Sequence, residues 1–207
     1  MPHEAMTEFL VTTTVHVPDG TAPQQVAELR ARQAATAHRL ATDGHLLRLW
    51  RPPGQWRTIA LCCAEGEDQL ERLLSAMPLR IWGTDEITAL GVQPDDPAVT
   101  GVVGRPGKGP EFLVTTTVTV PSDTPASAVE HEYARAPGRA RELAERGHLV
   151  RQWALPVGPD GPRTLGLWRA RDPGELMAIL ESLPLSGWMT IETTPLSPHP
   201  DDPIRLR

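Results

Sequence analysis

The sequence predicts an α+β protein made of two ferredoxin-like βαββαβ units, packed sheet to sheet as a dimeric α+β barrel within one chain. Segment 8–15 recurs letter for letter at 111–118, and segment 44–50 recurs with small changes 103 residues later, at 147–153. Within each repeat, stretches of strand-like alternation and helical periodicity follow one another in the order βαββαβ. Each sheet would carry helices on one face only, so the second copy is the obvious cover for the other face.

The repeats predict the division of the chain. Repeat 1 covers residues 1–97, a Gly/Pro-rich linker covers 98–110, and repeat 2 covers 111–207. The shift between the repeats grows from 103 to 106 residues after a longer hairpin loop at 156–162. We therefore interpret the chain as a dimer fused into one polypeptide.

The elements of repeat 1 follow from its periodicity and its turn residues. Phe9, Val11 and Val15 share one face of the first strand, and Gly44 occupies the C-terminal cap of the first helix. In repeat 2, Pro137 and Gly138 predict a kink or break in the equivalent helix. The strands and helices expected in repeat 1 lie, in chain order, at 9–17, 22–43, 45–51, 56–63, around 70–77 and at 79–90.

Composition and charge narrow the classes of function. The net charge of −6 argues against broad binding to nucleic acid or to an anionic membrane, since both require a basic face. There is no apolar run of membrane-spanning length, and the N-terminus lacks the order of a secretory signal, so we expect a cytoplasmic protein. The adjacent Cys62 and Cys63 point to opposite faces of a strand and are expected to be buried structural thiols. No spacing of His and Cys typical of a metal site occurs.

Several segments together resemble the muconolactone isomerase family. They are the opening strand at 8–15 followed by Pro18, the segment 44–51, the Met77-Pro78-Leu79 turn, and the closing segment 194–200. The resemblance implies a cofactor-free enzyme that moves a double bond within a small carboxylated lactone. It also implies a small-molecule ligand and a possible homo-oligomer of the fused pseudo-dimer.

That chemistry needs a base, a cation for the substrate carboxylate, and an apolar pocket. The resemblance places an acidic residue in the middle of the first helix, but this sequence has Gln33 there in repeat 1 and Ala136 in repeat 2. Neither side chain can accept a proton, so either the base has moved or the isomerase activity is lost. The replacement bases we consider are His16 on the first strand, His38 on the first helix and Glu132 in the second repeat, although such residues are more often on the surface.

Two repeated patterns are candidates for substrate binding, together with Gln33. Arg48 with Trp50, and Arg151 with Trp153, are two residues apart on a strand and share a face. An arginine beside an indole suits a planar carboxylate, although packing of Arg on Trp is an equal alternative. Glu86 and Glu192 on the last strands could serve as acid or base, or could line the contact between the halves.

Three classes of function remain open from the sequence. The first is the isomerase-like enzyme without metal or cofactor. The second is a non-catalytic small-molecule-binding or assembly protein that has lost the base. The third is a cofactor-independent oxygenase or cyclase on the same barrel, in which an aromatic pocket orients the substrate.

Overall fold

The computed structural model describes residues 6–55, 57–104, 107 and 109–205. The chain forms two compact units, which differ from the two sequence repeats. Unit 1 holds Met1–Leu90 together with Ser197–Arg207, and unit 2 holds Gly91–Leu196. Because each unit includes the C-terminal segment of the other repeat, neither repeat forms a unit by itself.

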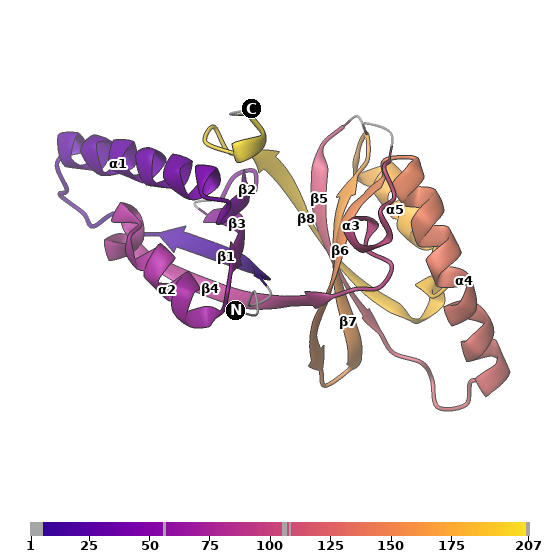
Figure 1. Cartoon of the computed structure of the whole chain (residues 1–207). Coiled ribbons are helices and arrows are strands. Elements are labelled where there is room, and N and C mark those ends of the chain that lie inside the picture. The colour runs from indigo at the N-terminus through magenta and orange to yellow at the C-terminus, as the bar shows by residue number, and fades with distance from the viewer. Residues whose placement is uncertain (1–5, 56, 105–106, 108, 206–207) are drawn as a thin grey trace, which may run out of the picture. The chain divides into compact units, whose positions relative to one another are not determined.

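Unit 1 contains one βαββαβ sequence, and α1 and α2 lie on the same side of its sheet (Figure 1). Its strands are hydrogen-bonded in the order β4-β1-β3-β2, all antiparallel. On β1, Phe9 and Val11 face the helices and pack with Ala37 of α1 and with Leu70 and Leu74 of α2. The elements are β1 Thr7–Val15, α1 Pro23–Thr42, β2 Leu46–Arg51, β3 Arg57–Ala64, α2 Glu67–Ser75, the 3₁₀ helix η1 Pro78–Trp82 and β4 Gly83–Val92.

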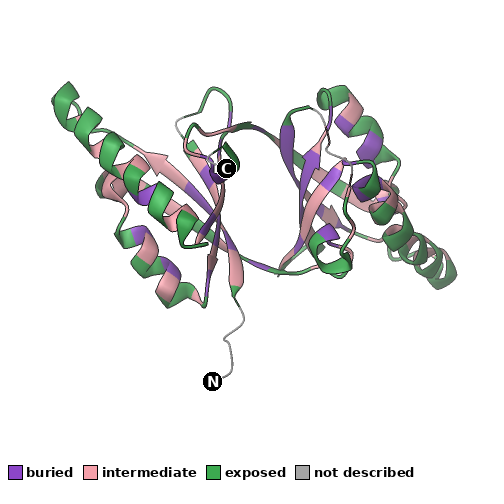
Figure 2. Ribbon diagram, turned by 45° about the horizontal axis from the view of Figure 1, so that its top comes forward, coloured by how far each residue is buried: buried purple, intermediate pink, exposed green. Residues whose placement is uncertain are grey.

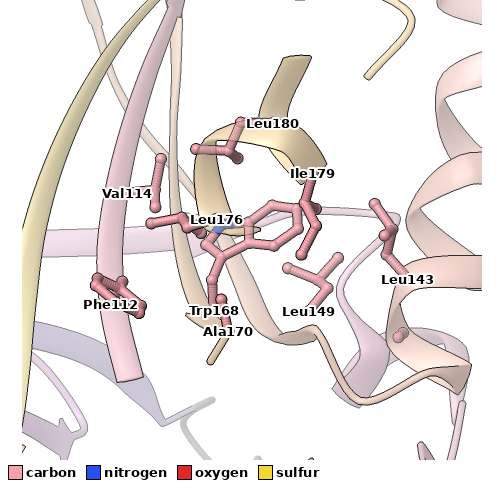
Figure 3. Packing of buried hydrophobic residues seen from close by; sticks show 10 residues of the cluster. Phe112, Val114, Leu143, Leu149, Trp168, Ala170, Leu176, Ile179 and Leu180 are labelled. Atoms are coloured by element: carbon pink, nitrogen blue, oxygen red, sulfur yellow. The ribbon is translucent and has the colours of Figure 1, made fainter. Parts of the chain in front are cut away.

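Unit 2 repeats this arrangement with the strand order β8-β5-β7-β6. Its core surrounds Trp168, whose indole lies among Leu149, Leu176 and Ile179 (Figure 3). Figure 2 shows that the outward faces of the helices are exposed, whereas buried residues gather on the strands and on the inner helix faces. The elements are α3 Pro97–Thr100, β5 Glu111–Val118, α4 Ala126–Glu145, β6 Leu149–Gly158, β7 Gly161–Arg169, α5 Pro173–Glu181, η2 Ser186–Trp188 and β8 Met189–Pro198, with η3 Pro203–Arg205 returning to unit 1.

The segments that follow Leu90 and Leu196 extend the sheets of the units they join. Gly91 and Val92, at the end of β4, pair with β6 in unit 2. Ser197 and Pro198, at the end of β8, pair with β2 in unit 1. Each unit is therefore completed by the tail of the other repeat.

The α+β class and the two ferredoxin-like units expected from the sequence are confirmed. Gly44 and its counterpart Gly147 both have φ of +80°, as expected for glycines that end a helix in the left-handed conformation. In the described part of the chain, no helix is long and apolar enough to cross a membrane.

Three local expectations were wrong, and one falls outside the described residues. Residues 79–82 form a 3₁₀ helix instead of strand, because Pro78 supplies a helical φ at the first position and the N–H of Arg80 bonds to the Met77 carbonyl. Helix α4 runs from Ala126 to Glu145 without the break that was the stronger form of the expectation at Pro137, which is exposed, so that water can bind the carbonyl left without a donor. Cys62 is buried, but Cys63 is only half-buried. The predicted start of the third strand, Trp56, lies outside the described residues.

Candidate active site

A cavity of about 340 Å³ lies in unit 2, between the helix-covered face of the sheet and helix α4. Its walls are mostly apolar, and its polar groups come from the sheet and from the chain segment that enters unit 2 after β4. The residues that line it are Gln93, Asp95, Val114, Thr116, Val118, Tyr133, Ala136, Pro137, Ala140, Leu149, Gln152, Ala154, Leu155, Val157, Pro162, Arg163, Thr164, Gly166, Trp168, Leu183, Pro184, Leu185 and Met189.

The floor of the cavity depends on a glycine beside a tryptophan on β7. A Cβ atom at Gly166 would come within 2.1 Å of Nε1 of Trp168, so the indole can lie over this strand only because position 166 has no side chain. Trp168 is 4% exposed, and its ring packs against Leu149 and Leu176 (Figure 3). Glycine and tryptophan together therefore make a flat aromatic surface in the wall of the cavity.

One polar group in the cavity wall has no partner within the protein. Oε1 of Gln152 is buried and forms no hydrogen bond with the part of the chain that the structure describes. Nearby, the hydroxyls of Thr116 and Thr164 bond to each other across β5 and β7 at 2.7 Å. An unpartnered buried amide oxygen costs about 1–3 kcal/mol, which a ligand that binds the carboxamide would relieve.

The segment after β4 reaches the cavity because Asp96 anchors it. Asp96 is 2% exposed and its carboxylate accepts hydrogen bonds from Nε of Arg151, at 3.2 and 3.1 Å, and from the backbone N–H of Gln152 at 3.0 Å. The guanidinium of Arg151 also lies over the Trp153 ring, 4.8 Å from its centroid. This network fixes the backbone of Gln152. It also places Asp95, the residue before Asp96, at the cavity wall.

Asp95 and Arg163 are the oppositely charged residues of the cavity wall. Among the described residues, neither side chain forms an ion pair with another group: the carboxylate of Asp95 has no bonded cation, and the guanidinium of Arg163 has no bonded carboxylate. The cavity therefore offers a base and a cation that the fold itself does not use. The described residues contain no group of His, Cys, Asp and Glu that could hold a metal ion.

The sequence profile of the muconolactone delta-isomerase family matches residues 7–96 and again 111–202. The two matches together cover most of the chain. The chain belongs to the muconolactone delta-isomerase family. The family profile matches each of its two sequence repeats once.

Two members of this family are each similar to a segment of this chain about as long as one repeat. The muconolactone delta-isomerase of Acinetobacter baylyi is 27% identical over 86 residues, which are 42% of this chain and 90% of that protein. The muconolactone delta-isomerase of Cupriavidus pinatubonensis is 28% identical over 86 residues, or 42% of this chain and 94% of that protein.

Solved structures match most of the chain in fold. A variant of chlorite dismutase from Candidatus Nitrospira defluvii has a TM-score of 0.57 at 12% identity, over 93% of this chain and 91% of that one. A heme-binding protein from Thermus thermophilus has a TM-score of 0.55 at 13% identity, over 93% of this chain and 92% of that one. At these identities the likeness concerns the fold alone.

The structure does not bring the three proposed bases of this isomerase-family chain together. His16 lies beyond the end of β1 and is exposed, and His38 is exposed on α1. Glu132 bonds to Arg135, one turn further along α4. None of the three lines the cavity, so we do not carry them forward as catalytic residues.

The two arginines expected to hold a substrate carboxylate instead hold carboxylates of the chain. Arg151 binds Asp96, and in unit 1 Arg48 binds the fully buried Asp202 and lies 4.6 Å from the centroid of the Trp50 ring. The chemistry expected from an arginine beside an indole is present, but its carboxylate comes from the tail of the other repeat. We therefore reassign these pairs, including Trp153, to positioning the tails.

The remaining candidates also lie away from the cavity. Glu86 and Glu192 are exposed. They pair with Thr12 and Thr115, whose neighbours along the strand face the helices, so both glutamates lie on the sheet face that the helices do not cover. Gln33 is half-buried on α1, where its Oε1 accepts the backbone N–H of Leu79 at 3.0 Å.

Reasoning from the sequence missed Asp95, Gln152 and Arg163. A signal for the first was present, since the tail motif at 93–97 recurs at 199–203 with both acids retained. Gln152 could have been found as the polar residue that replaces Leu49 of repeat 1 within an otherwise similar strand.

Proposed function

We propose that the unit 2 cavity binds a small cyclic carboxylated molecule of the lactone type and moves a proton within its ring without a cofactor. The observation that carries this proposal is a mostly apolar cavity of about 340 Å³ whose buried Gln152 carboxamide and whose charged residues have unused bonding capacity. This volume lies near the lower end of the range for small-molecule sites, about 300–1,000 Å³, and suits a single ring with a short acid side chain.

Asp95 is the residue we assign as the base. Its carboxylate takes a proton from a ring carbon, the C–H electron pair spreads toward the lactone carbonyl as an enolate, and Asp95 returns the proton two atoms away. The proton is conserved, so no oxidant or second substrate is needed. The apolar residues of the same cavity wall, including Val114 and Leu155, would exclude water that could quench the enolate.

Arg163 and Gln152 are assigned to binding. Arg163 stands at the hairpin end of β7, where its guanidinium can pair with the substrate carboxylate. The carboxamide of Gln152 can present its oxygen or, after a half-turn, its N–H to the ring. The side-chain N–H is the group that a developing enolate oxygen requires, and the bond from the backbone N–H of Gln152 to Asp96 fixes the strand from which the carboxamide extends.

A second candidate is a non-catalytic small-molecule-binding protein. The observation that favours it is Ala136, which faces the cavity from α4 at the position where the family resemblance places an acid. In that case Asp95 would contribute to binding or solubility only.

The two candidates are separated by turnover. Conversion of muconolactone by the full chain would be followed by ultraviolet absorbance, with Asp95→Asn and Arg163→Ala compared with the matched variants Asp201→Asn and Arg57→Ala at the equivalent positions of unit 1. We expect Asp95→Asn to lower kcat by about 100-fold or more, the usual contribution of a base. We expect Arg163→Ala mainly to raise KM, and both matched variants to behave as the wild type.

Each result has one meaning. Full turnover in Asp95→Asn would remove Asp95 as the base. Binding of the saturated analogue 5-oxotetrahydrofuran-2-acetic acid without any turnover of muconolactone by the wild type would favour the binding protein. Absence of both binding and turnover would overturn the proposal.

A further inference from the structure

We infer that the ligand binds in unit 2 and not in the equivalent place in unit 1, because Gln33 and an ion-paired cluster of Thr13, Asp85 and Arg80 fill that place. This inference rests on the proposed function, since it concerns which unit holds the site. It follows from comparing each residue of the cavity wall with its counterpart in the other repeat.

The first difference is on the long helix. Ala136 of α4 lines the cavity, and its counterpart on α1 is Gln33. The longer side chain crosses from α1 to η1, where its Oε1 accepts the N–H of Leu79 at 3.0 Å. Leu79 is itself the counterpart of Leu185, another residue of the cavity wall. In unit 2 the cavity lies between Ala136 and Leu185. In unit 1 a hydrogen bond joins the two equivalent residues, Gln33 and Leu79.

The second difference is on the sheet. Thr116 lines the cavity, and its hydroxyl bonds to that of Thr164 on the neighbouring strand. Its counterpart Thr13 instead donates to Oδ1 of Asp85 at 2.6 Å. The other oxygen of Asp85 pairs with Nε of Arg80 at 3.1 Å, and the Asp85 side chain is only 7% exposed.

The counterparts of Asp85 and Arg80 in unit 2 cannot form such a cluster. They are Ile191, which packs against the core, and Ser186, which bonds to the backbone of Glu181. Unit 2 therefore lacks the charged residues that occupy this region in unit 1.

The third difference is the floor. Val11 pairs with Ala60 and Phe9 with Cys62 on β3, whereas Val114 pairs with Gly166 and Phe112 with Trp168 on β7. Among the described residues, the flat indole surface made possible by a nearby glycine is found in unit 2. All three differences favour binding in unit 2. Each either provides space or a surface for a planar ring in unit 2, or occupies the equivalent place in unit 1.

The experiment locates a bound ligand in the intact chain. The probe is 5-oxotetrahydrofuran-2-acetic acid, which is saturated and cannot isomerise. Amide chemical shifts of the labelled full-length wild type would be followed on titration. We expect changes along α4 and β7, one bound probe per chain by calorimetry, and no changes along α1 and β3.

Two variants test the cause with a matched pair. Ala136→Gln introduces into unit 2 the residue that closes unit 1, and should weaken binding at least about tenfold. Gln33→Ala is the matched control and should leave the affinity of the wild-type site unchanged. The amide titration needs no variant, so the inference remains testable if Ala136→Gln fails to fold.

The outcomes separate this inference from the proposed function. Shift changes along α1 and β3, or weaker binding in Gln33→Ala with none lost in Ala136→Gln, would overturn the inference and leave a ligand-binding protein. No binding by the wild type would overturn the proposed function, and the inference with it.

Discussion

Asp96 and Arg151 are 55 residues apart in the chain and form an ion pair in which Nε of the arginine contacts both carboxylate oxygens, at 3.2 and 3.1 Å. The carboxylate side chain is 3% exposed and the arginine side chain 24%. Asp202 and Arg48 form the equivalent pair in unit 1. These two pairs fix the tails that the repeats exchange, and in unit 2 the tail carries Asp95 to the cavity.

The Asp96–Arg151 pair should therefore support stability as well as the site. Asp96→Asn keeps the size of the side chain but removes the negative charge that the half-buried guanidinium of Arg151 binds, which should lower the free energy of unfolding by about 3 kcal/mol. Urea denaturation would measure this as a lower midpoint with an unchanged m-value. Asp95→Asn, one residue away and without an ion pair among the described residues, is the control and should change stability by less than about 0.5 kcal/mol. Equal stability of both variants would show that the tail is held by other contacts.

The sequence was informative where the signal is local or repeated. Strand and helix periodicity placed the βαββαβ order. The strand-two pattern predicted that each arginine beside a tryptophan binds a substrate carboxylate or packs on the indole, whereas in the structure each arginine lies over its indole and binds an aspartate of the chain. It did not identify that carboxylate, because Asp96 and Asp202 meet their arginines only after the tails are exchanged, and nothing local encodes that exchange. Pro137 was misleading because it removes a single N–H at an exposed place, which the rest of α4 tolerates.

The cavity itself could not be read from the sequence for a related reason. It depends on Ala136, Gly166 and Trp168, which lie on a helix and a strand far apart in the chain. Trp168 could be recognised as an aromatic that the repeat does not pair. That its ring needs the missing side chain of Gly166 is a fact of three-dimensional packing.

Gln152 should lower the free energy of unfolding while it contributes to ligand binding. Its buried Oε1 lacks a donor among the described residues, whereas the counterpart Leu49 in unit 1 has no polar side chain. Gln152→Leu should raise the free energy of unfolding by about 1 kcal/mol, because the desolvated amide is removed. The same variant should weaken binding of the saturated lactone acid. A variant that is less stable and binds normally would show that the carboxamide is satisfied in solution without a ligand.

Gly166 and Trp168 should be energetically coupled. Gly166→Ala alone places a methyl group within 2.1 Å of the indole nitrogen, and the resulting displacement of the ring should cost about 1–3 kcal/mol. In a Trp168→Cys background, which reproduces the Ala60 and Cys62 pair of unit 1, the same change should cost much less. A double-mutant cycle by urea denaturation would measure this difference. Additive effects would mean that the backbone at 166, and not the indole, limits the size of the side chain.

Cys62 should make the protein lose stability at alkaline pH. Burial, with smaller contributions from Asp85 and Cys63, raises the pKa of the Cys62 thiol from 9.0 to about 12. Below pH 9 the thiol is neutral in both the folded and the unfolded chain, so the raised pKa costs nothing. Between pH 9 and about 12 the unfolded chain releases this proton while the folded chain retains it, and the free energy of unfolding therefore falls as pH rises.

The size of that decline can be isolated by comparing slopes. Since one pKa unit corresponds to about 1.4 kcal/mol, Cys62 should contribute a slope of up to about that amount per pH unit above pH 9. Urea midpoints measured from pH 8 to 10.5 should fall less steeply in Cys62→Ala than in the wild type, whatever the variant loses in packing. Cys63→Ala removes the less buried thiol, whose pKa burial also raises, and should retain the Cys62 part of the slope. An unchanged slope in Cys62→Ala would assign the alkaline sensitivity to other groups, since the thiol would then ionise equally in both states.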